Sequence, residues 1–317
     1  MALVATLTVL LVPVVVLRLL GVDAGYPLPA VLTVFPWIVA LLVAVAGGGL
    51  ALGARRLAAT AGVAALLGAT VLVPRALPGP APAEAPTGPV RTIAVANLRL
   101  GEADADAVVA AVREHDVDVL LTLELTEPAI ARLDAAGLGS LLPEVALLPS
   151  GLTSGGGIHA RDPLTPLAPS DARRFGATPR AALDVAGAPR VVVEGVHPLP
   201  PIDPGWTRDW RAALTALPAP AIGAADDVVL LAGDLNATHD HAPFRALLDA
   251  GWVDAADARG RGLVPTFHGL PWGEPVPPVA LDHVLVDRRV AVEAVTTAPL
   301  PGSDHRILVV RLRLPAG

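Results

Sequence analysis

Three long apolar stretches open the chain and constrain its fold more than any other feature. They cover residues 1–20, about 28–52, and 57–73. A helix needs about 20 apolar residues to cross a bilayer, and each stretch approaches or exceeds that length. A signal peptide followed by buried core helices is the alternative, but three consecutive stretches with almost no internal charge do not fit it. We therefore predict a transmembrane anchor of about three helices over residues 1–77.

The arginines that flank these stretches predict an orientation. Arg55 and Arg56 lie in the very short connection between the second and third stretches, and basic connections of this kind stay in the cytoplasm. Three crossings then place everything after Arg75 on the outer side of the cytoplasmic membrane. Because Arg18 also falls on the outer side, the charge bias is modest. We expect a multi-pass protein, with the lipid bilayer as a partner and the following domain outside the cytoplasm.

The amino-acid composition excludes several kinds of chemistry. The apolar fraction of 53% is concentrated in the first part of the chain. There is no cysteine, which excludes disulfides, thiolate metal sites and cysteine nucleophiles. Every basic residue is an arginine, so a P-loop lysine and a Schiff-base lysine are excluded as well. The net charge of −7 provides no general attraction to nucleic acid.

A proline-rich segment at residues 78–90 predicts an extended spacer that stands the next domain off the membrane. Residues 91–317 alternate short apolar runs with amphipathic segments, which is typical of an α/β domain with helices covering sheets. We expect strands at 92–96, 117–125, 191–196, 228–232, 281–286 and 307–314. Helices are expected at 104–115, 127–135, 208–217 and 241–250.

Polar residues occur where these predicted strands end. Side chains two apart on a strand share a face, so Asp234 and Asn236 can point into one site, and the preceding Gly233 permits close approach of backbone or substrate. The other strand-end residues are Asn97, Glu124, His197, Asp282 with His283, and the run Ser303-Asp304-His305.

Together these segments resemble the endonuclease/exonuclease/phosphatase superfamily, to which DNase I-like nucleases, sphingomyelinases and inositol polyphosphate phosphatases belong. Gly233-Asp234-Leu235-Asn236 is similar to its Gly-Asp-Phe-Asn signature, and Asp282-His283 and Ser303-Asp304-His305 match its Asp-His and closing Ser-Asp-His. Residues 157–163 resemble a segment that usually reads Ser-Arg-x-Pro, although Ala160 replaces the serine. Leu123 likewise stands where glutamine is frequent. The resemblance spans residues 91–314 and implies a two-sheet β-sandwich flanked by helices.

The resemblance also implies a reaction, the in-line attack of water on phosphorus with help from Mg²⁺ or Mn²⁺. Glu124 would bind the metal ion, with Asn97 beside it and Asp304 completing the shell. His305 would act as general base or orient the phosphate, held in its tautomer by Asp282.

Three further residues would serve the substrate. Asp234 and Asn236 would position the water and the scissile phosphate, and His197 would stabilise charge in the transition state. Family members differ in the group that takes the proton, so several assignments of the base stay open. Outside this set, a zinc site at His239 and His241 is disfavoured against a loop and helix start, and His283 is expected to pack beside Asp282. No persuasive partner is evident for His159 or His268.

The leading interpretation is a membrane-anchored phosphoester hydrolase. Its substrate could be a phospholipid headgroup, a nucleic acid or a small phosphoester, and no obligate protein partner is evident. A catalytically silent binding or scaffold domain on the same fold is the alternative. It is disfavoured because every position that the chemistry needs is retained. A transport component is disfavoured too, because Arg18 is the one charge inside the apolar stretches and lies near an end.

Overall fold

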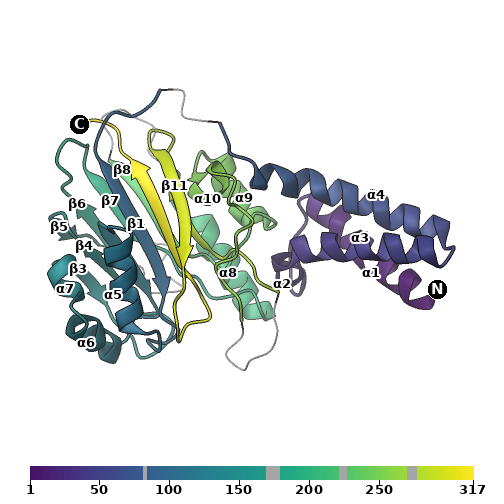
Figure 1. Ribbon diagram of the computed structural model, residues 1–317, viewed down its shortest axis with the longest axis horizontal. Helices are drawn as coiled ribbons and strands as arrows, with labels where there is room; N and C mark the ends of the chain where they lie inside the picture. Colours follow the sequence, from purple (N-terminus) through teal and green to yellow (C-terminus); the bar gives the residue numbers. More distant parts are fainter. Residues whose placement is uncertain (81–83, 169–178, 221–226, 270–276) are drawn as a thin grey trace.

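The computed structural model describes residues 1–80, 84–168, 179–220, 227–269 and 277–317. Two mixed β-sheets pack face to face, helices cover their outer faces, and a bundle of N-terminal helices projects from one end of the sandwich (Figure 1). The two-sheet sandwich flanked by helices that the resemblance implied is therefore confirmed.

The first sheet is built around β1 (Val90–Asn97). This strand pairs in parallel with β2 (Val119–Leu123) and antiparallel with β12 (Ile307–Arg313). The full order is β11-β12-β1-β2-β4-β3, in which β11 is Ala291–Ala298, β4 is Gly156–Ala160 and β3 is Glu144–Leu148. The central strands are rich in valine, isoleucine and leucine because both of their faces are covered.

The second sheet has the same plan around β8 (Val228–Asp234). This strand pairs in parallel with β7 (Val191–Gly195) and antiparallel with β10 (Asp282–Val286). The full order is β5-β6-β7-β8-β10-β9, in which β5 is Leu164–Pro166, β6 is Arg180–Leu183 and β9 is Val253–Asp254.

The main hydrophobic core lies between the two sheets. Alternate residues of the central strands point inward, and Val95, Leu121, Val193, Leu230 and Val310 are all buried in one cluster. Burial of each such side chain contributes about 1.5–3 kcal/mol to folding. The core therefore fixes how the two sheets are placed relative to one another.

Helices cover the outer face of each sheet. On the first sheet these are α5 (Ala105–Glu114), α6 (Glu127–Ala135) and α7 (Leu138–Leu141), and on the second α8 (Pro204–Ala216) and α9 (Ala242–Asp249). A short helix, α10 (Ala255–Ala258), follows β9. Asp104 caps α5, Thr126 caps α6 and Asp203 caps α8, each accepting hydrogen bonds from the first helical N–H groups.

The apolar stretches form an N-terminal bundle. Its members are α1 (Ala2–Leu19), α2 (Leu28–Thr33), α3 (Phe35–Ala51), α4 (Arg55–Leu72) and the 3₁₀ turn η1 (Val73–Ala76). The second stretch is thus divided between two helices. Among the described residues, Ala2–Leu19 and the 22 residues Arg55–Ala76 are long and apolar enough to cross a membrane, whereas Phe35–Ala51 is a shorter apolar helix. By this measure two spans are identified where about three were predicted.

A buried carboxylate joins this bundle to the sandwich. Asp240, at the start of α9, is fully buried, and one of its oxygens lies 2.7 Å from Arg18 Nε on α1. Arg75 of η1 binds the same carboxylate through both of its terminal nitrogens, at 2.7 and 2.9 Å. Burial opposes the charge on Asp240, but Arg75 and Arg18 outweigh it and hold its pKa below the usual value.

Further contacts surround this ion pair. Asp23 accepts hydrogen bonds from Arg211 on α8 and from the backbone N–H of Ala242 at the start of α9. His241 Nε2 lies 2.9 Å from the carbonyl oxygen of Pro29. The bundle is therefore docked on the sandwich, and the predicted stand-off by the proline-rich segment is wrong. Residues 81–83 of that segment lie outside the described part of the chain.

Most predicted elements are present. The helix at 127–135 matches α6, and the strand at 228–232 is the first part of β8, which continues to Asp234. The strands that were not predicted are β3, β4, β5, β6, β9 and β11. These strands are short, sit toward the sheet edges or contain many glycine and alanine residues, so their hydrophobic pattern is weak.

We predict that Asp240→Asn weakens the docking of the bundle. The change leaves two buried guanidinium groups without a counter-charge, a loss of roughly 3–5 kcal/mol. Hydrogen exchange of the full chain in detergent should show faster exchange around η1 and the start of α9, together with a lower melting temperature. Asp227→Asn is the control, because Asp227 pairs with Arg190 on the surface. Equal effects of the two substitutions would contradict the role given to Asp240.

Candidate active site

The candidate site lies at one edge of the sandwich. In each sheet two central strands are parallel, so their carboxyl ends face the same edge. Asn97 ends β1, Glu124 follows β2, His197 follows β7 by two residues and Asp234 ends β8. Packing of the two sheets brings all four strand ends together.

The antiparallel neighbours complete the same edge. Asp282, the first residue of β10, lies opposite Asp234 in the strand register. His305 lies two residues before β12, which runs antiparallel to β1. Every predicted catalytic residue therefore reaches this edge from the end or the start of a central strand, or from the loop that follows it.

Glu124 and Asn97 contact each other. The amide nitrogen of Asn97 lies 3.2 Å from one Glu124 oxygen and 3.3 Å from Asp234 Oδ2. The other Glu124 oxygen accepts a 2.7 Å hydrogen bond from the backbone N–H of Leu100. Glu124 adopts a positive φ of 53°, which is uncommon outside glycine and turns its carboxylate toward the site. Asn97 presents its nitrogen to the carboxylates, while its oxygen accepts a bond from the N–H of Arg99.

Asp234 occupies the centre of the cluster. Its Oδ1 accepts a 2.9 Å hydrogen bond from the backbone N–H of Asn236, a tight turn in which Asn236 has a φ of 47°. The amide of Asn236 donates to the carbonyl of Pro198, which lies next to His197. Gly233 is required because a Cβ there would collide with the carbonyl oxygen of Val196. This glycine brings the β7 and β8 ends into direct contact.

His305 lies between two carboxylates. Its Nδ1 is 2.8 Å from Asp282 Oδ2, and its Nε2 is 3.4 Å from Asp234 Oδ2. Three residues outside the predicted set hold this arrangement. Thr266 Oγ1 accepts hydrogen bonds from the N–H groups of Leu281 and Asp282, and the ring of Phe267 packs edge-on against the imidazole of His305. Nothing in the sequence singles out Thr266 or Phe267. Ser303, the first residue of the closing motif, bridges Asn97 and His305 through its hydroxyl.

The charges in this cluster are strongly coupled. Burial opposes a charge on His305, but Asp282 and Asp234 outweigh it and raise the pKa of His305 to about 10. Burial also raises the pKa of Asp234, against the opposing effect of His305. The two carboxylates therefore favour the protonated, cationic form of His305.

His197 and Asp304 complete the predicted set. His197 Nε2 lies 3.8 Å from Glu124 Oε1 and 3.7 Å from Asp234 Oδ2, so it faces both carboxylates. Its buried Nδ1 makes no hydrogen bond with the described residues. Asp304 is half-buried; its carbonyl accepts from the N–H of His268, and its carboxylate helps to raise the pKa of His305.

The donor set fits a hard divalent cation. Glu124, Asp234 and Asp282 bring three carboxylates together, and Mg²⁺ and Mn²⁺ prefer such oxygens. The buried Oδ1 of Asp282 makes no hydrogen bond among the described residues. Asp234, Asp282 and His305 also form a group whose possible ligand atoms lie within 4.8 Å of one another. The excess of carboxylate over imidazole favours a cation at this edge.

A second buried group of potential ligands joins His239, Asp254 and His283. His239 Nε2 lies 2.6 Å and His283 Nδ1 3.2 Å from the same Asp254 oxygen, while His283 Nε2 bonds to the carbonyl of Ala237. The expectation that His283 packs beside Asp282 is wrong, because neighbouring strand residues point to opposite faces. We interpret this group as a hydrogen-bonded brace that holds β9 and β10 to the loop after Asn236.

His241 and His159 have partners that the sequence did not indicate. His241 Nδ1 accepts from the N–H of Thr238, so this ring and His239 do not share a metal. His159 Nε2 lies 3.4 Å from the hydroxyl of Thr122, and burial lowers the pKa of His159 to about 4. His159 is therefore a neutral residue of the first sheet.

Comparison with known proteins identifies the family of this domain. The Endonuclease/Exonuclease/phosphatase family matches residues 94–305, which include every candidate site residue. The chain belongs to this family. No curated protein matches the sequence significantly.

Solved structures share the fold at low sequence identity. An endonuclease/exonuclease/phosphatase from Beutenbergia cavernae is 19% identical with a TM-score of 0.54, over 71% of this chain and 72% of that one. A humanized D. rerio TDP2 is 15% identical with a TM-score of 0.54, over 71% and 99% of the respective chains. A family protein from Bacteroides thetaiotaomicron is 15% identical with a TM-score of 0.50, over 72% and 99%.

Proposed function

We propose that this chain is a membrane-anchored, divalent-metal-dependent phosphoester hydrolase that works outside the cytoplasm. The observation that carries the proposal is the convergence of Glu124, Asp234, His305 and Asp282 at one edge of the sandwich. A family of phosphoester hydrolases matches this part of the chain. A catalytically silent scaffold would have no reason to keep buried carboxylates so close together, since such clusters cost stability.

Glu124 would hold Mg²⁺ or Mn²⁺, with Asn97 and Asp304 as proposed further ligands, although Asn97 must first turn its oxygen toward the ion. When bound, such an ion neutralises charge on the phosphate oxygens. His305, which is protonated at neutral pH, orients and neutralises the phosphate, and Asp282 keeps its ring in place. His197 faces the same space and stabilises the negative charge that develops on the phosphoryl group.

Asp234 is the proposed base for the attacking water. Burial raises its pKa, which makes this carboxylate a better proton acceptor than an exposed one. The N–H of Asn236 holds one of its oxygens, leaving Oδ2 directed toward His305 and His197. Asn236 would position the scissile phosphate beside it. The protonated His305 cannot itself act as the base until it loses its proton.

The N-terminal bundle supports the membrane anchor. Its outward-facing side chains are apolar, with Leu3, Val9, Val43 and Leu66 each about 60–70% exposed. A surface of this kind is unfavourable in water and suited to lipid. Arg55 begins α4 at the end of the bundle remote from the sandwich, which is the cytoplasmic end in the proposed orientation. Arg18 lies at the junction, where it is neutralised by Asp240.

The geometry of the candidate site is compatible with several classes of phosphoester substrate. One structure of D. rerio TDP2 holds a single-stranded DNA product, and its fold is similar to this one. Phospholipid headgroups, nucleic acids and small phosphoesters all contain the bond that such a site attacks. The net charge of −7 argues against extended nucleic acids, because they bind chiefly through basic surfaces.

His305→Ala is predicted to abolish metal-dependent turnover. Loss of the group that orients and neutralises the phosphate should lower kcat on a generic phosphodiester by about 10²–10³-fold, the range for removal of one group that stabilises charge in the transition state. The full chain would be assayed in detergent with Mg²⁺, Mn²⁺ or a chelator. His268→Ala is the matched control, since His268 is exposed and should keep wild-type turnover. Wild-type rates in His305→Ala would rule out the proposed role.

The orientation can be tested with single cysteines, because the natural chain has none. Thr87→Cys should be labelled by an impermeant maleimide in intact cells, whereas Leu52→Cys in the α3–α4 connection should be labelled only after the cells are opened. Both positions are exposed. Labelling of both cysteines in intact cells would contradict the three-span arrangement.

A further inference from the structure

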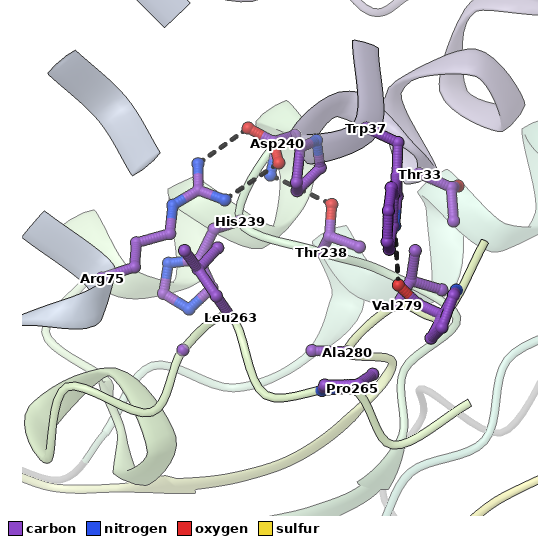
Figure 2. A pocket seen from close by; sticks show the side chains of 13 residues that line it. Thr33, Trp37, Arg75, Thr238, His239, Asp240, Leu263, Pro265, Val279 and Ala280 are labelled. Atoms are coloured by element: carbon purple, nitrogen blue, oxygen red, sulfur yellow. Dashed lines mark hydrogen bonds and ion pairs between the residues drawn. The ribbon is translucent and has the colours of Figure 1, made fainter. Parts of the chain in front are cut away.

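A cavity of about 330 Å³ lies between the N-terminal bundle and the sandwich (Figure 2). Thr33 and Trp37 of the bundle form one side, and Leu263, Pro265 and Val279 of the sandwich form the other. The volume is at the lower end of the range of small-molecule sites, roughly 300–1,000 Å³. Most of these side chains are apolar, so the cavity suits a ligand with an apolar part.

One end of the cavity is polar. Arg75 and His239 line it, and Figure 2 shows the Arg75 guanidinium bound to Asp240 beside the His239 ring. Arg18 binds the same carboxylate, and Arg245 donates to its backbone carbonyl. Asp23 faces Arg245, and Asp257 faces Arg75 and His239, so the arginines at this end are balanced by nearby carboxylates. The polar end therefore offers hydrogen-bonding groups beside an otherwise apolar cavity.

Two segments that line the cavity also carry candidate active-site residues. Thr238 lines the cavity two residues after Asn236, and Ala280 lines it two residues before Asp282. Two residues of extended chain span at most about 7 Å. The backbones of the cavity wall and of the catalytic residues are therefore close on two separate segments.

A short ladder links the cavity to His305 as well. Phe267 forms backbone bridges with Val279 on one side and with His305 on the other. Neighbouring strands are about 4.8 Å apart, so the Val279 backbone lies roughly 10 Å from that of His305. The ring of Phe267 packs against the imidazole. The backbone of Phe267 therefore connects the wall of the cavity to the candidate site.

The bundle side of the cavity is placed at the membrane surface by the proposed anchor. Trp37, near the start of α3, is 47% exposed and donates from Nε1 to the carbonyl of Pro278 at 2.9 Å. Tryptophan rings with one polar contact are typical of the headgroup level of a bilayer. A lipid in the outer leaflet would meet the cavity at this residue.

We propose that the cavity receives the apolar part of a phosphate-bearing membrane lipid, whose phosphoester is the substrate of the adjacent site. The inference rests on the proposed function and names its substrate class. The cavity is too small for a whole phospholipid, so it would take the portion next to the headgroup, with the acyl ends left in the bilayer. A soluble phosphoester would need no such cavity, and its hydrolysis would be independent of the bundle.

Thr33→Trp tests the proposal, because it fills the cavity from the bundle side. Within the described part of the chain, the Thr33 hydroxyl donates to the carbonyl of Pro29 in its own helix. Thr60→Trp is the matched control. Thr60 is exposed on α4, and its hydroxyl donates to the backbone carbonyl of Arg56 in the same way. Each full chain would be placed in vesicles of phosphatidylethanolamine and phosphatidylglycerol. The phosphatidylglycerol carries a photoactivatable diazirine near the carboxyl end of one acyl chain. On illumination, the diazirine cross-links the lipid to the residues that it contacts.

The expected cross-links fall on residues 263–269 and 277–282 of the sandwich. Thr33→Trp should lower them at least about tenfold, the factor that corresponds to 1.4 kcal/mol of binding, whereas Thr60→Trp should not. Cross-links confined to α1, α3 and α4, or unchanged by Thr33→Trp, would overturn the proposal.

Turnover of bis(p-nitrophenyl) phosphate separates this inference from the proposed function. Wild type, Thr33→Trp and Thr60→Trp should hydrolyse this soluble diester equally. Soluble turnover without cross-links on the sandwich would overturn the lipid substrate alone. Cross-links without turnover of any ester would contradict the hydrolase, and with it the assignment of the lipid as a substrate.

Discussion

The site depends on the alignment of two parallel strand pairs, one in each sheet. β1 and β2 direct their carboxyl ends to the edge at which β7 and β8 end, and packing of the two inner faces brings those ends together. Asn97, Glu124, His197 and Asp234 are positioned by this alignment. None of them sits on a long loop, so their geometry follows from the same hydrophobic burial that stabilises the domain. Gly233 permits the close contact between the second pair and the loop after β7.

The electrostatics of this edge explain why a cation is expected there. Glu124, Asp234 and Asp282 place three carboxylates against two imidazoles in a largely buried space. His305 responds with a pKa raised to about 10, and Asp234 with a raised pKa of its own. Both shifts reduce the net negative charge of a buried cluster. A divalent ion would serve the same purpose while leaving the carboxylates ionised, which is the state that the proposed hydrolysis needs.

The same principle operates at the junction between the bundle and the sandwich. Asp240 is fully buried and is tolerated because Arg18 and Arg75 supply its counter-charges from two different elements. The loop that carries Asp240 begins just after Asn236. One short segment therefore connects the candidate catalytic residues, the ion pair at the junction and the cavity.

Sequence reasoning identified the residues of the site better than their surroundings. Asp234, Asn236, Glu124 and His305 stand at or next to strand ends within recognisable motifs, and strand direction together with packing of the two sheets brings them to one edge. Asp240 could not be assigned in this way. Its partners lie 165 and 222 residues away along the chain, and nothing local distinguishes it from a solvated loop acid.

The roles of Thr266 and Phe267, and the contact between the bundle and the sandwich across the proline-rich segment, likewise could not be predicted from local sequence. Thr266 and Phe267 act through contacts formed only after the chain has folded. The proline-rich segment predicted a spacer between the bundle and the sandwich. Its composition holds no information about whether the domains on either side touch.

The central claim is that this strand edge binds a divalent metal ion through Glu124. Titration of the full chain with Mn²⁺, followed by electron paramagnetic resonance, measures it directly and requires no knowledge of the substrate. We predict saturable binding that Mg²⁺ displaces and that Glu124→Gln weakens by at least about tenfold, or 1.4 kcal/mol. Glu293→Gln, which alters a carboxylate paired with Arg311 on the first sheet, should bind Mn²⁺ as wild type does. Equal affinity in wild type and Glu124→Gln, or no saturable binding in either, would contradict the account.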